Sequence, residues 1–320
     1  MTFAPVGLFV FRRPAHTRRM VASLMTNPEF NKSPIYVFAD AARTNSEVSL
    51  VAETRSLVRA MLPDAIFVEA ENNLGLARSI KLGVDQLTKK YGKAIVVEDD
   101  LLVSPDFLAF MNTGLEKYAN ENSIFQIAGY LPPTGDRFNM RAVALPFTIS
   151  WGWGTWDRAW KDFDLKFSSA QSIISEKKLR KQFDLGGAYP FSRLLKKHME
   201  GRIDSWAIAW YSYVFHKKAA AIYPPISRVT NDGLDGSGTH GALRASSEER
   251  IQKIAPPTFA SAVLWPLTAE INSADMEVVC QAFRRTTSVT GTFRNIFING
   301  VSYIWRLHVT KYLSKIFNKS

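Results

Sequence analysis

The sequence predicts an α/β fold in which a mostly parallel, twisted sheet is flanked by helices. Through the first 130 residues, short apolar segments of the kind that form buried strands alternate with amphipathic, helix-like segments. Beyond residue 130 this alternation stops, and turns and clustered tryptophans take its place. Strands that alternate with helices build βαβ units, which pair in parallel and bury both faces of the sheet.

Four strands and the helices between them are expected in the first part of the chain. A polar segment with apolar residues at helical spacing follows the first strand. Residues 46–62 and 74–91 place apolar side chains along one side of a helix, and Ser104 with Pro105 should open another helix as its cap and first-turn proline. The strands are expected at residues 6–11, 34–40, 65–70 and 94–98.

The second part of the chain has a different pattern. Residues 150–160 and 204–210 hold clusters of tryptophan, and the lysine-rich residues 177–197 are typical of an exposed helix. Residues 231–241 are rich in glycine and are expected to form a mobile loop. We therefore expect an elaborated second half on the same domain.

Composition limits the class of protein. A chain of 320 residues with 46% hydrophobic and 22% charged residues can build a sizeable core. Its one cysteine, Cys280, excludes a disulfide framework and a cysteine-rich metal site and fits a reducing compartment. The apolar residues near the start precede Arg12 and Arg13, the wrong order for an export signal, and no apolar run reaches the roughly 18 residues that span a bilayer. We therefore expect a cytoplasmic protein.

The formal net charge of +11 indicates an anionic partner: a nucleic acid, an acidic lipid surface or a phosphorylated substrate. Seven of the positive charges follow Glu277, after which no acidic residue occurs. Residues 293–320 mix these charges with apolar side chains, as in a basic amphipathic helix at the inner face of an anionic membrane. A terminal helix docked on the core is the alternative, and the sequence leaves both open.

Three consecutive acids, Glu98, Asp99 and Asp100, follow directly on an apolar run. A strand of an open α/β sheet presents its final residues at the edge where ligands bind. Carboxylates this close repel one another, and a hard divalent ion such as Mg²⁺ or Mn²⁺ would offset that repulsion and in turn hold a diphosphate. A solvated acidic turn is the alternative, but the buried-type strand before the acids and the helix after them favour the metal site.

The segment VVEDDLLVSPDFLAFMN, residues 96–112, resembles the metal-binding segment of the N-acetylglucosaminyltransferase I family. Members of this family are inverting glycosyltransferases of the GT-A fold, with a Glu-Asp-Asp version of the DxD motif. The resemblance implies that Asp100 ligates Mn²⁺ or Mg²⁺, and that Glu98 and Asp99 face the ribose and the sugar of a nucleotide-sugar donor.

Two segments upstream match the family in the same order along the chain. FRRPAHTRR, residues 11–19, is similar to an arginine-bearing turn that contacts the nucleotide phosphates. Arg13 is the best match to that arginine, and Arg12 is the fallback. Asp40 stands at the end of the second strand, where the family has an aspartate that faces the uracil.

A fourth match lies downstream. SRVTNDGLDGSGTHG, residues 227–241, is similar to a family loop that orders over the donor diphosphate. The resemblance implies a phosphate contact for Thr239 and a place in the metal shell for His240. The glycines also suit such a loop without the resemblance, because they let backbone N–H groups approach phosphate oxygens. A plain linker is the alternative.

An inverting transferase needs a carboxylate that takes the proton of the acceptor hydroxyl. GRIDSWAIAW, residues 201–210, is similar to the Trp-Asp-Asp-Trp segment that holds the family's base, which implies this role for Asp204. A cap for the helix that begins near Ser205 is the alternative for this aspartate, and the two roles are compatible. Asp157 is a second candidate for the base.

The tryptophans of residues 150–160 have two interpretations. A sugar ring stacks well on an indole, and Trp151 or Trp153 is expected to line the acceptor and sugar pocket. A packed core is the alternative, and it is the expectation for the other tryptophans of this segment.

Together these observations predict a metal-dependent inverting glycosyltransferase of the hexosyl- or N-acetylhexosaminyltransferase type. The donor would be a nucleotide-diphosphate sugar, with UDP as the expected nucleotide. The acceptor would be a saccharide or a lipid-linked glycan, as in polysaccharide biosynthesis, and no nucleic-acid partner is expected. The resemblance divides the GT-A domain, residues 1–280, into a nucleotide-binding half of about 1–130 and an acceptor-side half of about 131–280. Residues 281–320 form the basic tail.

Two alternatives remain. A sugar-phosphate nucleotidyltransferase shares the nucleotide-binding architecture, but it would carry a glycine-rich signature after its first strand, where this chain has FRRPAHTRR. A non-catalytic basic protein that binds lipid or nucleic acid would have no use for the acidic triplet at the end of a buried strand.

Overall fold

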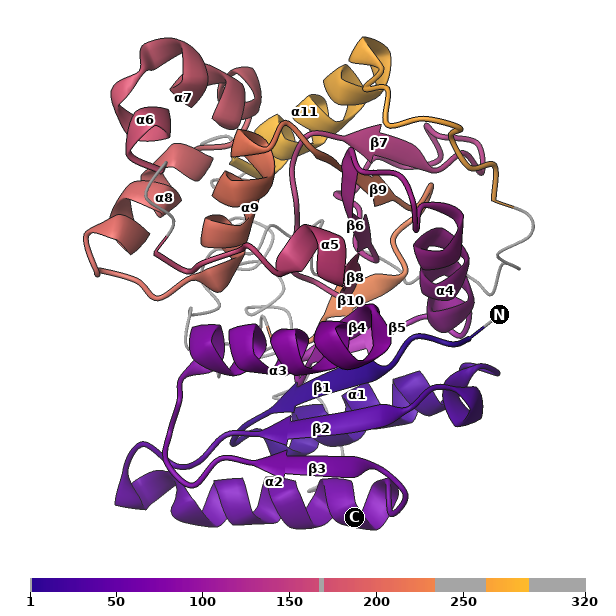
Figure 1. Ribbon diagram of the computed structural model, residues 1–320, viewed down its shortest axis with the longest axis vertical. Helices are drawn as coiled ribbons and strands as arrows, with labels where there is room; N and C mark the ends of the chain where they lie inside the picture. Colours follow the sequence, from indigo (N-terminus) through magenta and orange to yellow (C-terminus); the bar gives the residue numbers. More distant parts are fainter. Residues whose placement is uncertain (1, 167–169, 234–262, 288–320) are drawn as a thin grey trace, which may run out of the picture.

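The computed structural model describes residues 2–166, 170–233 and 263–287 of the chain (Figure 1). In this part of the chain no helix is both long and apolar enough to cross a membrane.

Four parallel strands form one side of the central sheet, and they confirm the expected strands to within two residues at each end. Their order is β3-β2-β1-β4, as expected for successive βαβ units. The strands are β1 (Val6–Val10), β2 (Ile35–Ala39), β3 (Ile66–Glu69) and β4 (Lys93–Glu98), and the connecting helices are α1 (Pro14–Met25), α2 (Val48–Met61) and α3 (Leu76–Tyr91).

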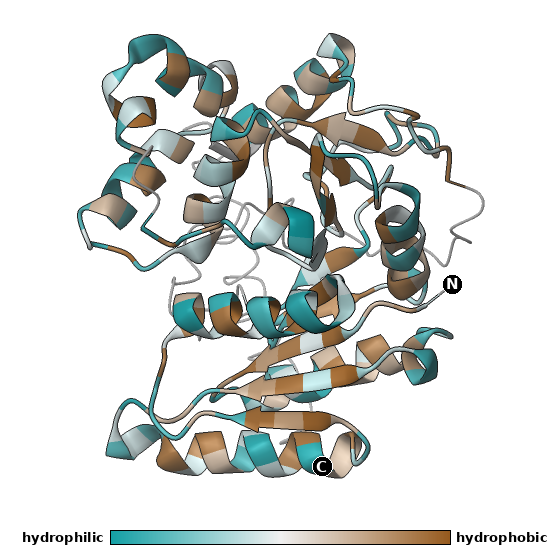
Figure 2. Cartoon of the chain, viewed as in Figure 1, coloured by the Kyte–Doolittle hydropathy of each residue, from teal (hydrophilic) through white to brown (hydrophobic). Residues whose placement is uncertain are grey.

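Helices cover both faces of these strands (Figure 1). Because side chains alternate along a strand, Leu8 of β1 belongs to the core shared with α1 and α2, whereas Phe9 belongs to the core shared with α3. Helix α3 ends at Gly92, which takes the left-handed conformation (φ 74°) and returns its N–H to the Thr88 carbonyl. Figure 2 shows the strands as apolar and the exposed helix faces as polar.

The second half extends the sheet to eight strands in the order β3-β2-β1-β4-β8-β6-β9-β7. Strands β6 and β9 run in the same direction as β4, whereas β8 and β7 run opposite to their neighbours. The sheet is therefore mostly parallel, as predicted. The added strands are β6 (Ile124–Ala128), β7 (Val143–Leu145), β8 (Trp153–Trp156) and β9 (Ala220–Tyr223).

Further helices surround this half (Figure 1). They are α4 (Phe107–Lys117), α5 (Asp157–Trp160), α6 (Ala170–Ser175), α7 (Lys177–Phe183), α8 (Phe191–Met199), α9 (Trp206–His216) and α11 (Ser273–Thr287). Short 3₁₀ turns lie at Phe30–Lys32 and Asn45–Glu47 in the first part of the chain and at Leu185–Gly187 in the second. The expected domain boundary at residues 280 and 281 falls inside α11. Residues 288–320, which hold most of the expected tail, lie outside the described residues.

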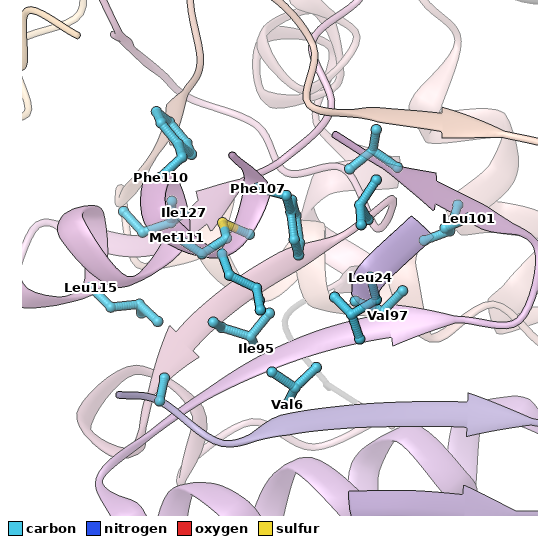
Figure 3. Packing of buried hydrophobic residues seen from close by; sticks show 14 of the residues in the cluster. Val6, Leu24, Ile95, Val97, Leu101, Phe107, Phe110, Met111, Leu115 and Ile127 are labelled. Carbon is cyan, nitrogen blue, oxygen red and sulfur yellow. The ribbon is translucent and has the colours of Figure 1, made fainter. Parts of the chain in front are cut away.

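The largest core joins the two halves of the sheet (Figure 3). Phe107, Met111 and Leu115 point from one side of α4 toward Ile95 of β4 and Ile127 of β6 (Figure 3). All five side chains are completely buried. This core fixes α4, and with it the segment between β4 and α4, against the sheet.

Two features between β4 and α4 differ from the sequence prediction. The helix begins at Phe107 rather than at Pro105, because the Ser104 hydroxyl donates a hydrogen bond to the Asp106 carboxylate instead of capping the helix. A short strand, β5 (Leu101–Val103), precedes it and pairs antiparallel with β10 (Val229–Asn231). No local pattern predicted this two-stranded ribbon.

A buried ion pair holds the β5–β10 ribbon against α4. Arg228, just before β10, is 1% exposed, and its Nε lies 3.0 Å from Oδ2 of Asp106, which is 7% exposed. The Arg228 carbonyl also accepts the Ser104 N–H at 2.9 Å. Both charges are desolvated, so each depends on the other for compensation.

Removal of one partner should therefore destabilise the fold strongly. We expect Arg228→Met to lower the free energy of unfolding by about 3–5 kcal/mol, because it leaves the Asp106 carboxylate buried without its cation. The matched control is Arg202→Met, whose partner Glu200 forms an exposed pair, and a change of at most about 1 kcal/mol is expected there. Urea denaturation measures both, and equal losses in the two variants would contradict the prediction.

Candidate functional site

The polar residues predicted from the sequence gather at one edge of the sheet. Strands β1, β2 and β4 are parallel, so their carboxyl ends meet at the same edge. Phe11 follows β1, Asp40 follows β2, and Asp99 follows β4. The Asp40 N–H donates to the Val10 carbonyl at 3.1 Å, and the Phe11 N–H donates to the Asp99 carboxylate at 3.3 Å. The end of β1 thus connects the two acids.

Arg13 is the cation that the structure places on the acidic triplet. It is the residue before Pro14, where α1 begins, and its Nη1 lies 2.9 Å from Oδ2 of Asp100. The side chains of Arg13 and Asp100 are 14% and 24% exposed, so the pair is mostly buried at this edge of the sheet and remains accessible to a ligand. Arg12 turns away and pairs with Glu47 at 2.8 Å. The structure thus favours Arg13 over Arg12 as the arginine of this site.

The three carboxyl groups are only partly compensated, and their pKa values show it. Burial, and then repulsion from Asp100 and Asp99, raise the pKa of Glu98 well above its ordinary value. Burial and the charge of Asp100 raise the pKa of Asp99 to about 7. Burial also raises the pKa of Asp100, although Arg13 opposes this shift. The Arg13 guanidinium therefore compensates only part of the charge of the three carboxyl groups.

His16 also belongs to this site, and the sequence analysis missed it. It lies one helical turn after Arg13 on the same face of α1 and is 9% exposed. Its charge lowers the pKa of Asp100, so its ring is close enough to act on that carboxylate. Only the three-residue spacing from Arg13 could have indicated it.

The segment after β10 lies directly on the Arg13–Asp100 pair. The Asp232 N–H donates to the Asp100 carbonyl at 2.7 Å, and the Asp232 carboxylate accepts from Arg19 of α1 at 2.6 Å. A Cβ added to Gly233 would lie 2.4 Å from Oδ2 of Asp100 and 2.8 Å from Nη1 of Arg13. A side chain at this position would therefore displace the pair.

The first residues of the predicted diphosphate loop thus contact the acidic triplet. Thr239 and His240, which were expected to contact phosphate and metal, lie outside the described residues.

The Asp40 carboxylate closes a turn before α3. It accepts the N–H groups of Ala41, Leu74 and Gly75 and the side-chain amide of Asn73, at 2.8–3.0 Å. Four donors occupy most of the acceptor positions of one carboxylate. The structure therefore gives Asp40 a definite part in shaping the edge, whereas its contact with uracil stays a prediction.

Asp204 lies beside the same turn. A Cβ added to Gly75 would lie 3.9 Å from Oδ2 of Asp204. The Asp204 side chain is exposed, and no hydrogen bond or ion pair joins it to any residue that the structure describes. Ser205, not Asp204, occupies the cap position of α9, and no side-chain hydrogen bond caps that helix. Among the described residues, none competes for this carboxylate.

Asp157, the second candidate for the base, lies at the wrong edge. It follows β8, which is antiparallel to β4, and the last residue of β8, Trp156, pairs with Lys93 at the start of β4. The acidic triplet lies at the other end of β4. The antiparallel register thus separates Asp157 from the triplet by the length of the strand.

The two tryptophans proposed for the sugar pocket have different environments. Trp151 precedes β8 at the edge of the triplet, is partly exposed and lies edge-on to Tyr130, with ring centroids 4.4 Å apart. Trp153 is fully buried and stacks on Trp206 at 5.1 Å within the tryptophan cluster of the core. The prediction for Trp153 is wrong, because its side chain points from β8 into the layer under α9.

The described residues contain no group of three or more His, Cys, Asp or Glu side chains placed to hold a metal by themselves. Oxygen ligands from Asp100, with partly compensated acids beside it, still suit an ion such as Mg²⁺ or Mn²⁺, which commonly takes one or two carboxylates and completes its shell with phosphate and water. The donor set therefore fits an ion that arrives with a diphosphate, rather than a permanent protein-only cage.

Comparison with known proteins confirms the resemblance predicted from the sequence. The sequence profile of the GNT-I family matches residues 1–145, from the N-terminal segment to the end of β7. Arg13, Asp40 and the acidic triplet all lie within the matched residues. No curated protein sequence matches the chain.

Several solved structures share the general course of the chain. GalNAc-T7 with UDP, GalNAc and Mn²⁺ is 10% identical, with a TM-score of 0.46, over 72% of this chain and 43% of that chain. TarS of S. aureus is 11% identical, with a TM-score of 0.40, over 74% and 37%. The galactosyltransferase LgtC in complex with donor and acceptor sugar analogues is 10% identical, with a TM-score of 0.37, over 68% and 72%.

The chain spans less than half the length of GalNAc-T7 and of TarS. The predicted α/β fold is confirmed, with a mostly parallel eight-stranded sheet between layers of helices.

The raised pKa of Asp99 predicts how the metal-free protein responds to pH. A carboxyl group with a pKa of about 7 in the folded chain and an ordinary value of 3.8 binds more protons in the folded state between these values. Its contribution to the free energy of unfolding therefore falls as the pH rises from about 4 to about 7. Asp99→Asn removes this penalty and keeps an oxygen for the Phe11 N–H.

We expect Asp99→Asn to unfold above the wild type at pH 8 in EDTA, by about 2–4 °C for each kcal/mol of the penalty removed, and the gap to narrow as the pH is lowered to 5. Thermal unfolding followed by circular dichroism measures the gap. Asp64→Asn, at an exposed position, is the control and should show none. A gap that does not change with pH would sink the prediction.

Proposed function

We propose that this chain, which carries the GNT-I family pattern over residues 1–145 on a GT-A fold, is a metal-dependent glycosyltransferase. It would move a sugar from a nucleotide-diphosphate donor, with UDP as the expected nucleotide, to the hydroxyl of a saccharide or lipid-linked glycan. One observation carries the proposal: three partly buried carboxyl groups lie at the carboxyl edge of a parallel sheet, where Arg13 pairs with Asp100.

The charge of the site supports a metal-bound diphosphate. Asp100 would hold Mn²⁺ or Mg²⁺, and such an ion supplies Lewis-acid stabilisation of the negative charge on a departing diphosphate. Arg13, already beside Asp100, would contact the same phosphate oxygens through its guanidinium. We further propose that Thr239 and His240 complete the phosphate and metal contacts, as the family pattern implies.

The remaining edge residues would position the nucleotide sugar. Among the residues that the structure describes, none hydrogen-bonds the Glu98 carboxyl, so it has free positions for a hydroxyl of the donor. Asp99 is held by the Phe11 N–H through one oxygen only. Asp40 would act on the base side, where the turn that it closes adjoins the end of β1.

Asp204 is the proposed general base for a direct displacement with inversion. The acceptor oxygen would attack the anomeric carbon while its proton passes to the Asp204 carboxylate, and the bond from that carbon to the diphosphate would break. The exposure of Asp204 and its position beside Gly75 support this role, because an acceptor can reach it from solvent at the edge that carries Asp40.

The central test is a screen of nucleotide sugars for binding and turnover, with and without Mn²⁺. We expect turnover of at least one UDP-sugar to require the ion and to fall by about 10²-fold or more in Asp100→Ala, because the ion loses its protein ligand. Asp64→Ala, an exposed acid away from this edge, should retain full activity. Unchanged turnover in Asp100→Ala, or no binding of any nucleotide sugar, would refute the proposal.

The role of Asp204 has a separate test. We expect Asp204→Asn to lower the rate of transfer by about 10²–10⁴-fold, the usual contribution of a general base, and to leave the affinity for UDP and Mn²⁺ unchanged. Calorimetric titration with UDP and Mn²⁺ measures the second quantity. Retained transfer would assign the base to another residue, and lost UDP affinity would indicate a structural role instead.

A further inference from the structure

A cavity of about 200 Å³ lies in the second half of the chain, between the ends of two sheet strands and three helices. Tyr130 and Trp151 reach it from the ends of the sheet strands β6 and β8, and Leu194, Ile208 and Phe283 reach it from α8, α9 and α11. Ser205, the neighbour of Asp204 in the chain, also lines it. The cavity therefore reaches the residue that follows Asp204 in the chain, whose carboxylate is proposed to activate the acceptor.

The chemistry of its walls is mostly apolar. None of the described residues that line the cavity carries a charge or a carboxamide, and their polar side-chain groups are hydroxyls and the indole N–H of Trp151. One of these is already used, because the Tyr211 hydroxyl donates to the Phe183 carbonyl at 2.9 Å. A sugar ring presents hydroxyls around its whole rim and needs polar partners for each when buried. These walls instead favour a hydrocarbon or an aromatic ring.

The size of the cavity limits which ligands it can hold. Pockets that bury a drug-sized ligand measure about 300–1,000 Å³. A volume of about 200 Å³ holds one ring or a short chain, but no oligosaccharide. The flanking rings of Trp151 and Tyr130, at 4.4 Å in an edge-on arrangement, form a stiff wall that can hold such a group in one orientation.

We propose that this cavity receives an apolar aglycone, so that the acceptor is a glycoside whose hydrocarbon or aromatic group lies next to the sugar presented to Asp204. The inference rests on the proposed function, and it adds a substrate class that the family match does not cover. Most of the lining residues follow residue 145, where that match ends. Leu194, Ile208 and Trp151 would determine specificity for the aglycone.

The test uses alkyl β-glucosides from methyl to hexyl as probes of the full chain, with UDP and Mn²⁺ present. Calorimetric titration measures their affinity. We expect affinity to rise about threefold to fourfold with each methylene that the cavity buries. Equal affinity for the methyl and hexyl compounds would overturn the inference.

A matched pair of variants locates the effect. Leu194→Trp fills the cavity and should abolish the dependence on chain length. Lys196→Trp places the same ring on the exposed side of α8, where the lysine is 63% exposed, and should leave the dependence intact. Retained UDP affinity shows that each variant is folded, and an unchanged dependence in Leu194→Trp would overturn the inference.

The two proposals fail separately. A chain that turns over a nucleotide sugar but shows no dependence on alkyl length has the proposed function without the apolar acceptor site. A chain that binds hexyl glucoside tightly in the cavity but binds no nucleotide sugar retains the apolar site and loses the glycosyltransferase assignment.

Discussion

The repulsion among Glu98, Asp99 and Asp100 is the constraint around which this edge of the protein is arranged. A buried strand places the three acids side by side, and the elements packed against them supply compensating groups. Helix α1 brings Arg13 and His16, and the end of β1 brings a backbone N–H. The Asp232 N–H donates to the backbone carbonyl of Asp100, so it holds the segment after β10 in place without compensating a carboxylate. The compensation is incomplete, as the raised pKa values show, and this incompleteness is what suits the site to a cation.

The fold on which this site depends was largely predictable from local patterns. Apolar runs located β1 to β4, and the acids at the end of β4 located the edge proposed to bind the donor. Residues whose role depends on distant partners were not predictable. His16 matters because a turn of α1 faces Asp100, and Trp153 is buried because β8 turns it under α9. Ser104 does not cap α4 for a similar reason. Its hydroxyl donates to Asp106, which is held by Arg228, a residue distant in the sequence.

The two sides of the edge differ in chemistry. The proposed donor side, from Arg13 to Asp100, is charged and belongs to the residues that match the GNT-I family. The acceptor side, from Trp151 to Phe283, is aromatic and mostly follows the matched residues. Asp204 lies where the two sides meet, beside the turn that Asp40 closes. Such a division lets one donor-binding half serve different acceptors through changes in the second half alone.

The β5–β10 ribbon has a consequence for the order of folding. It pairs Val103 with Val229, whose positions differ by well over a hundred residues, and closing so long a loop costs entropy before its contacts are formed. The β1–β2 and β2–β3 pairs join strands that are much closer in the chain, and all four parallel strands precede β10, so they can form as the chain emerges during synthesis. The acidic triplet therefore forms early in folding, and strand β10, which pairs with β5 beside it, forms late. During that interval a nascent chain presents its anionic edge without β10 beside it, so the edge is open to cations.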